Sequence, residues 1–570
     1  MTPRINRRVA FTILLAFSCT FLVLYRIDDY GRDYSQYYTL LQAAGSDKSV
    51  SFKFSIKTRF LQAPRPQPMG PRNPTLLCTT RSTHLPSSPT RIDLPLPDGF
   101  LNLNSSEVRS LSHNISCAFR CFRKKFGDDD HLDYGSWRRL EVFGNRTLQD
   151  CEFAEVDCRK TTFPHTSIYS NMHARVVPNA CLHQNYVNSG ASKPNVILFV
   201  LDSVSEAAWR RNLPKTFNVL QDDYKSTVFK GFNKVGDNSF PNAVAFLTGK
   251  RVMSPGAPSE LPEDMTNSFF DDWPLIWNEF SRHNYSTLYA EDLIKVNLFY
   301  YLSKGFKGTP VDHYFRPFWL QVYDSFIYRR STPLCFGNKK SHNVQLEYLK
   351  SAIRAYKDKA PLFALHWLTE LSHDWANQVG VGDEDIAAFF AELTEDLKDS
   401  YVFVFSDHGH RFDLIRQTVN GRLEERLPFF SIHVPESEIR RNPEMKKVLK
   451  RNAKKLSSFW DLHATLLHIL GQDSPPYNTH NGQSLLRDLP DRNCRAADIP
   501  EEQCVCQQES SPISVILRSL KHHLNAILKD HTRCSQLELA KIHFAYTVLP
   551  NKQVAFGPRR LLFNPWSTLY

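Results

Sequence analysis

Two short apolar runs, each ending in aspartate, constrain the fold of this chain more than any other feature. Residues 195–202 read Asn-Val-Ile-Leu-Phe-Val-Leu-Asp, and residues 401–407 read Tyr-Val-Phe-Val-Phe-Ser-Asp. Short runs of this kind are typical of strands buried on both faces of a parallel sheet. Ligands bind at the carboxyl ends of strands in open parallel sheets. The sequence therefore predicts that Asp202 and Asp407 lie at a ligand-binding sheet edge.

The residues around these runs alternate between helical and extended patterns. The predicted elements are helices at 240–248, 274–281, 384–397 and 457–470, and extended segments at 287–290 and 362–367. Such alternation indicates an α/β fold, with a mixed, mostly parallel sheet flanked by helices on both faces.

The composition predicts a folded body and argues against nucleic acid as a partner. The 570 residues exceed what one core usually organises, so we expect a large domain with appended segments. Hydrophobic residues make up 42% and charged residues 23%, which is ordinary for a globular protein. The net charge of +11 is spread along the chain and forms no basic block interleaved with aromatics. We interpret it as solvated surface.

The amino terminus predicts the compartment. Arg4, Arg7 and Arg8 precede an apolar run at 9–25, which is just long enough to span a bilayer as a helix. Basic residues stay on the cytoplasmic side. We predict a cytoplasmic tail at 1–8, an uncleaved signal anchor at 9–25 and a stem at 26–91, hence a single-pass type II membrane protein with a lumenal or extracellular body. Cleavage of the run and secretion are the alternative.

Sequons and cysteines agree with export. Glycosylation sequons, which are used only on the exported side, occur at Asn104, Asn114, Asn145 and Asn284. Ten of the 12 cysteines cluster at 78–181 and 494–534. We expect disulfides there, with zinc at Cys117/Cys121 or Cys504/Cys506 as the rival interpretation. The sequence does not determine which cysteine pairs with which. Since Cys335 is isolated and the count outside the anchor is odd, one thiol is expected to be free or intermolecular.

The cysteine distribution also suggests boundaries within the exported body. A Cys-rich, glycosylated segment is expected at 92–192, an α/β core at 193–490 and a Cys-bearing carboxy-terminal segment at 491–570.

Aspartates and a histidine at the ends of the two runs suggest metal binding. Asp202, Asp407 and His408 offer hard oxygen and imidazole nitrogen ligands, a set that suits zinc or manganese. A strand-end aspartate alone is more often a helix cap. Ser239 is predicted as the amino-terminal cap of the helix that Gly249 ends. Its ordinary role is capping; its chemical role is that of a nucleophile at the positive end of a helix.

The order of these motifs resembles the alkaline phosphatase/sulfatase superfamily. The motifs are Asp202 after a buried strand, Ser239-x-Pro241 opening a helix that closes with Gly249, and residues 406–409, Ser-Asp-His-Gly. Within the superfamily, the chain is similar to a metazoan family known as domain of unknown function 229, from about Cys78 nearly to the end. The segments that carry this similarity are 235–242, 290–292, 304–306, 312–317, 371–374, 421–428, 492–494 and 504–506.

The resemblance implies site residues. It makes Asp202, Ser239, Asp407 and His408 the ligands of one metal, with Ser239 also the nucleophile. It places His373 near a second metal or the substrate's oxyanion, where it would assist the leaving group. Weaker candidates for a possible second metal site, each more commonly a loop hydrogen bonder, are Glu370, Asp374, His410 and His480.

The resemblance also implies a reaction. Sulfatases that use formylglycine have arginine where this chain has Ala243, so that route is not expected, and serine stands where family members often have threonine. We expect a metal-dependent phosphoester hydrolase or phosphotransferase that passes through a covalent phospho-enzyme. The expected substrate is an ester of a lipid headgroup, glycan or nucleotide. The alternatives are a sulfatase-like esterase, or an inactive extracellular glycoprotein that binds an anionic glycan or a protein.

Overall fold

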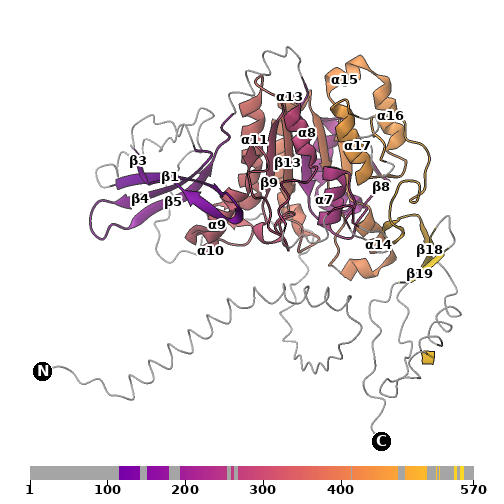
Figure 1. Ribbon diagram of the computed structural model, residues 1–570, viewed down its shortest axis with the longest axis horizontal. Helices are drawn as coiled ribbons and strands as arrows, with labels where there is room; N and C mark the ends of the chain where they lie inside the picture. Colours follow the sequence, from indigo (N-terminus) through magenta and orange to yellow (C-terminus); the bar gives the residue numbers. More distant parts are fainter. Residues whose placement is uncertain are drawn as a thin grey trace, which may run out of the picture. The chain divides into compact units, whose positions relative to one another are not determined.

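A seven-stranded sheet forms the centre of the fold (Figure 1). The computed structural model describes residues 115–140, 151–178, 193–252, 259–261, 268–412, 414–472, 482–509, 522, 525–526, 545–548 and 553–556. The strands of the central sheet are, in spatial order, β10 (His313–Tyr314), β9 (Ser286–Glu291), β13 (Leu362–Leu368), β6 (Val196–Leu201), β14 (Tyr401–Phe405), β15 (Phe430–His433) and β7 (Thr227–Val228). The pairs from β10 to β14 are parallel, and β15 and β7 are antiparallel. The predicted mixed, mostly parallel sheet is confirmed.

Helices cover both faces of this sheet, because its central strands are apolar on both sides. In β6, Val196, Leu198 and Val200 enter one core, while the alternate residues enter the other. The helices that pack in the first core are α7 (Ser239–Thr248), α8 (Ile276–Arg282), α16 (Glu444–Asn452) and α17 (Phe459–Ile469). Those in the second core are α5 (Glu206–Asn212), α6 (Pro214–Asp222), α9 (Arg316–Asp324), α11 (Ser341–Tyr356) and α12 (Asp383–Glu392).

Shorter elements complete the described part of the chain. The remaining helices are α10 (Phe326–Arg330), α13 (Thr394–Leu397), α14 (Val419–Arg426), α15 (Glu436–Arg441) and single 3-10 turns at Ile294–Val296, Gln378–Gly382, Leu414–Gln417 and Glu501–Gln503. The remaining short strands are β8 (Phe232–Asn233), β11 (Cys335–Phe336), β12 (Lys339–Lys340), β16 (Ser457–Ser458), β17 (Gln507–Glu509), β18 (Ala545–Val548) and β19 (Gln553–Phe556). The helix predicted at 384–397 is two helices, α12 and α13, which meet at Leu393.

An antiparallel sheet precedes the central sheet in the chain. Its strands are β1 (Ile115–Lys125), β2 (Asp128–Tyr134), β3 (Arg138–Leu140), β4 (Phe153–Lys160) and β5 (Ser167–Ala174), in the order β2-β1-β4-β5 with β3 against β1. It packs against α9, as Figure 1 shows. Arg316 of α9 is buried, and its Nε donates to the Asp129 carbonyl oxygen at 2.8 Å while Nη2 contacts Asp130 Oδ1 at 3.1 Å. Because both partners lie on β2, a buried guanidinium holds the antiparallel sheet against α9.

Disulfides lie in both segments where they were predicted. Cys117 pairs with Cys158 and Cys121 with Cys151, so β1 is linked to β4 and to the residues just before it. Cys494 pairs with Cys504 in the carboxy-terminal segment. Cys335 is not the free thiol, since it is itself disulfide-bonded; among the described residues the free cysteine is Cys506.

Several predictions fall on parts of the chain that the structure does not describe. They are the tail, anchor and stem at 1–91 and the sequons at Asn104, Asn114 and Asn145. Asn284, the fourth sequon, is exposed and has a positive φ of 60°. Within the described ranges, no helix has the length and apolar character needed to cross a bilayer.

Replacement of Phe232 tests the packing beneath the loop that leads to α7. The Phe232 ring is fully buried, 3.9 Å from the Phe430 ring between centroids and nearly parallel to it. Since Phe-to-Ala changes in cores cost about 3–5 kcal/mol, Phe232→Ala should lower the free energy of unfolding by that amount. Chemical denaturation measures the change. Phe126→Ala, at a ring that is 73% exposed, should change it by less than about 0.5 kcal/mol; equal losses in both variants would contradict the packing.

Candidate active site

The carboxyl ends of β6 and β14 bring two buried carboxylates together. The strands are paired in parallel with Phe405 opposite Val200, and an aspartate stands two residues after each member of this pair, Asp407 after Phe405 and Asp202 after Val200. Between them, the Ser203 amide donates to Asp407 Oδ1 at 2.9 Å and the Ser203 hydroxyl donates to Asp202 Oδ1 at 2.6 Å. Ser203 has a left-handed φ of 61°, which costs a non-glycine residue energy and is characteristic of functional sites.

Ser239 reaches this pair from the start of α7. The prediction that Ser239 caps the helix is wrong by one residue: Asn238 has the extended cap conformation, and Ser239 is the first helical residue. Its hydroxyl bonds to other partners. Ser239 Oγ donates to Asp202 Oδ2 at 3.2 Å and lies 3.3 Å from His408 Nε2.

Asn242, which no sequence motif marked as a site residue, holds the loop before Ser239. Its side chain is fully buried and uses all of its polar capacity. Oδ1 accepts from the amides of Val235 and Gly236, both at 2.8 Å, and Nδ2 donates to the carbonyls of Gly236 and Asn238 at 3.1 and 2.9 Å. The sequence does contain a sign of this role, namely an asparagine inside an otherwise apolar helix. A buried side-chain amide needs hydrogen-bond partners, so such an asparagine indicates a structural contact.

His408 presents an unprotonated nitrogen to the carboxylates. Its Nδ1 donates to the Gly409 carbonyl oxygen at 2.9 Å, so Nε2 keeps a lone pair. Nε2 lies 3.2 Å from Asp407 Oδ2, a buried oxygen that accepts no hydrogen bond from the described part of the chain. Both atoms are therefore electron-pair donors that face each other.

The electrostatics of this group favour a cation. Burial raises the pKa of Asp202, with the charge of Asp407 adding to the effect, and burial also raises the pKa of Asp407. Burial lowers the pKa of His408 to about 3. The ligand atoms of these three residues lie within 4.8 Å of one another. Two carboxylates, a neutral imidazole and a hydroxyl at such distances fit zinc or manganese.

The second-site candidates do not join this group. His373 Nδ1 lies 2.8 Å from Asp374 Oδ1 at the edge of the site, and Glu370 accepts a hydrogen bond from the Tyr328 hydroxyl at 3.1 Å. His410 is buried, and His480 lies outside the described residues. Among the described residues, the acidic, histidine and cysteine groups spaced for a metal are the Asp202 group and three cysteines, so a second metal stays a prediction.

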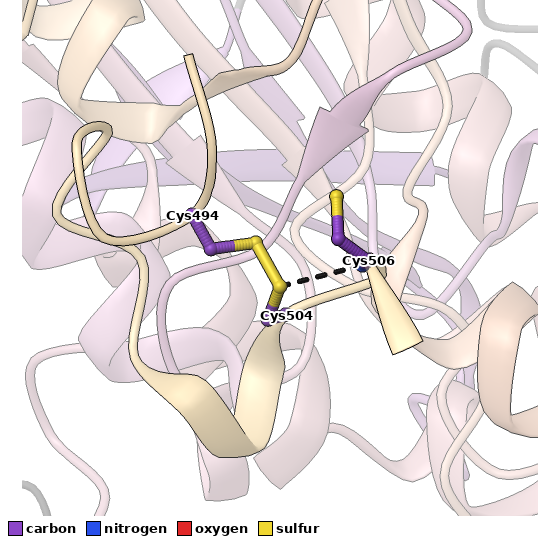
Figure 2. Close-up of side chains that lie close together, drawn as sticks. All are labelled: Cys494, Cys504 and Cys506. Atoms are coloured by element: carbon purple, nitrogen blue, oxygen red, sulfur yellow. Dashed lines mark hydrogen bonds between the residues drawn. A yellow bond between two sulfur atoms is a disulfide. The ribbon is translucent and has the colours of Figure 1, made fainter. Parts of the chain in front are cut away.

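Those three cysteines are unsuited to holding a metal (Figure 2). Cys494 and Cys504 form a disulfide, and the Cys506 amide donates to Cys504 Sγ at 3.3 Å. Burial raises the pKa of the Cys506 thiol, which disfavours the thiolate that metals need. The zinc interpretation of Cys504/Cys506 is therefore wrong.

Two further carboxyl groups lie at the end of β9, in the segment 290–292, to which the sequence motifs assigned no role. Glu291 is fully buried and accepts from the Tyr289 hydroxyl and from the Leu298 amide, the latter at 3.1 Å. Asp292 Oδ1 accepts from the Thr369 amide at 2.7 Å. Burial raises the pKa of Glu291 to about 8 and that of Asp292 to about 7.

Comparison with known proteins finds one family and several distant folds. The family described as "Protein of unknown function (DUF229)" matches residues 90–543. No sequence among the curated proteins matches the chain.

Three solved structures illustrate the distant likeness. The zinc complex of the periplasmic domain of EcEptC from Escherichia coli has 12% identity and a TM-score of 0.36, covering 54% of this chain and 90% of that one. The lipoteichoic acid synthase LtaP from Listeria monocytogenes has 14% identity and a TM-score of 0.35, covering 55% and 80%. An alkaline phosphatase superfamily protein from Vibrio parahaemolyticus has 15% identity and a TM-score of 0.37, covering 55% and 72%.

Asp407→Asn should affect the metal-free and metal-bound proteins in opposite directions. In the metal-free protein, the new Nδ2 would donate to His408 Nε2 where two acceptors now meet, and a buried charge would be lost. We expect a gain of about 1–3 kcal/mol in unfolding free energy without metal. Zinc, in contrast, should stabilise the variant far less than the parent. Thermal unfolding with and without zinc measures both effects; a metal-free variant less stable than the parent would contradict the geometry.

Glu291→Gln should flatten the dependence of stability on pH. Because the folded pKa of about 8 lies above the unfolded value of 4.5, the folded state holds the extra proton between these limits, and stability falls as pH rises through them. The fall is roughly 3–5 kcal/mol and should be largely absent in the variant. Denaturation at pH 5, 6, 7 and 8 measures it. Glu384→Gln, at a side chain 79% exposed, should keep the parent's slope; an unchanged slope in Glu291→Gln would refute the assignment.

Proposed function

This chain belongs to the DUF229 family, and we propose that it is a metal-dependent phosphoester hydrolase or phosphotransferase of the alkaline phosphatase/sulfatase type. The observation that carries the proposal is the position of Ser239 Oγ, 3.2 Å from Asp202 Oδ2 and 3.3 Å from His408 Nε2. A serine hydroxyl among metal-ligand atoms, at the amino end of a helix, has the surroundings of an activated nucleophile.

The proposed first step transfers the phosphoryl group to Ser239. Asp202, Asp407, His408 and Ser239 would hold one zinc or manganese ion, which supplies Lewis-acid stabilisation of phosphoryl charge and lowers the pKa of a coordinated hydroxyl. Ser239 Oγ forms a bond to phosphorus as the bond to the leaving alcohol oxygen breaks. Asp202 Oδ2 accepts the hydrogen bond of the hydroxyl and so offers its proton an acceptor.

The proposed second step releases the phosphoryl group. His373, held by Asp374 through Nδ1, assists the departing alcohol and then the incoming water or acceptor alcohol. Attack of that oxygen on phosphorus breaks the bond to Ser239 Oγ and restores the serine. With water the product is phosphate or a phosphate monoester, and with an alcohol it is a new ester, so one site supports both hydrolysis and transfer.

We also propose where this chemistry takes place. The predicted anchor at 9–25 would hold the site beside a membrane, on the lumenal or extracellular side. Substrates within reach there are phosphate esters of lipid headgroups, glycans and nucleotides. Sulfate esters are the second choice, because Ala243 is fully buried in α7 at the position where formylglycine-dependent sulfatases have arginine.

Ser239→Ala tests the nucleophile. The parent, loaded with zinc or manganese, is screened against phosphomonoesters, phosphodiesters and sulfate esters, and metal content is determined for each protein. We expect phosphoester turnover that falls by about 10³-fold or more in the variant, because no other group forms the covalent intermediate. Ser437→Ala, on the surface helix α15, is the matched control and should keep full activity. Parent-level turnover in metal-loaded Ser239→Ala would exclude the proposal.

A further inference from the structure

A group of charged side chains lies beside the proposed nucleophile and takes no part in the steps above. It joins the loop before Ser239, the loop after His408 and helix α14. We call it the cationic cluster; its members are Lys234, Asp237, Arg411, Arg416 and Glu425. Three of these groups are positive and two are negative, so the cluster carries one net positive charge.

The cluster is tied to both halves of the site. Asp237 stands two residues before Ser239, and Arg411 stands three residues after His408. Arg411 Nη1 donates to Asp237 Oδ2 at 2.9 Å, which joins the two loops directly. The Gly409 amide donates to the Glu425 carbonyl at 3.0 Å, so helix α14 supports the loop that carries Arg411.

Two of the three cations are committed to partners within the cluster. Lys234 is fully buried and contacts Glu425 and both the carbonyl and Oδ1 of Asp237, the latter two at 3.2 and 3.7 Å. Arg416 bridges Asp237 and Glu425 at 3.2 and 3.4 Å. Since Arg411 also shares Asp237 with these two cations, three positive groups face two carboxylates, and one positive charge in the cluster is not balanced.

Arg411 has unused hydrogen-bonding capacity. Its side chain is only 15% exposed, and its Nε is buried without an acceptor among the described residues. Its guanidinium lies 5.0 Å over the ring of Phe412, and that ring lies 5.6 Å from the ring of His373. An unpaired donor on a largely buried cation is costly, and an anion bound at the site would satisfy it.

We infer that Arg411 binds a non-bridging oxygen of the tetrahedral oxyanion at the metal site and so makes the site selective for anionic esters. The inference rests on the proposed function, which places that oxyanion at Ser239. Guanidinium groups suit phosphoryl oxygens because their N–H donors form a planar fork, and such charge-assisted bonds are stronger than neutral ones. Arg411 would therefore contact the substrate itself.

Orthophosphate binding to the full-length, zinc-loaded protein tests this role. Isothermal titration calorimetry gives the dissociation constant for the parent, Arg411→Gln and Arg411→Lys, with zinc content and thermal unfolding determined for each. We expect about 10- to 100-fold weaker binding in Arg411→Gln and partial retention in Arg411→Lys, which keeps the charge but not the fork. Arg211→Gln is the matched control, because Arg211 is bound by Glu424 on α14, at 3.0 and 2.7 Å, and should leave binding unchanged.

The outcomes separate this inference from the proposed function. Phosphate affinity within about twofold of the parent in zinc-loaded Arg411→Gln would overturn the inference, as would an equal loss in Arg211→Gln or no phosphate binding by the parent. If Ser239→Ala abolishes ester turnover while Arg411→Gln leaves kcat/KM unchanged, the proposed function stands and the inference fails. If Arg411→Gln loses phosphate binding while the parent hydrolyses and transfers no ester, the inference stands and the proposed function fails.

Discussion

The pairing of β6 with β14 determines the rest of the site, because it ends two buried strands in carboxylates side by side. Two buried negative charges repel each other and lose hydration, so an arrangement of this kind needs compensation. The protein supplies part of it through amide and hydroxyl donors from Ser203 and through the backbone amide of His408, which donates to Asp407 Oδ1 at 2.9 Å. The lone pairs of His408 Nε2 and Asp407 Oδ2 still face each other at 3.2 Å. A divalent cation would provide the compensation that the protein lacks.

Charge is distributed unequally around this centre. On the side of α14, the cationic cluster adds positive charge next to Ser239. On the side of β9, burial raises the pKa values of Glu291 and Asp292 to about 8 and about 7, so much of their negative charge is suppressed near neutral pH. Both features reduce the repulsion that an incoming anionic ester would meet. The site thus has added positive charge on the α14 side and reduced negative charge on the β9 side.

Local patterns were sufficient for four of the seven strands of the sheet, for several of its helices and for the end positions of Asp202 and Asp407, because apolar periodicity reports burial directly. The helix boundary at Ser239 was off by one residue, since a capping residue is chosen by backbone dihedrals that the pattern does not encode. Arg411 and Asn242 were not found. Their importance depends on partners such as Asp237, 174 positions away from Arg411, and sequence spacing gives no information about such contacts.

The contact between β2 and α9 has a consequence for synthesis. Asp129 leaves the ribosome long before Arg316, which lies 187 positions later in the chain and donates a hydrogen bond to the Asp129 carbonyl oxygen. The antiparallel sheet can close early, since Cys117 and Cys158 are only 41 positions apart. The central strand β6, in contrast, must wait for β13 and then β14 before it has neighbours on both sides. Until then its unpaired, apolar edges are exposed to other chains, so the middle of translation is the stage at which nascent molecules are most prone to aggregate.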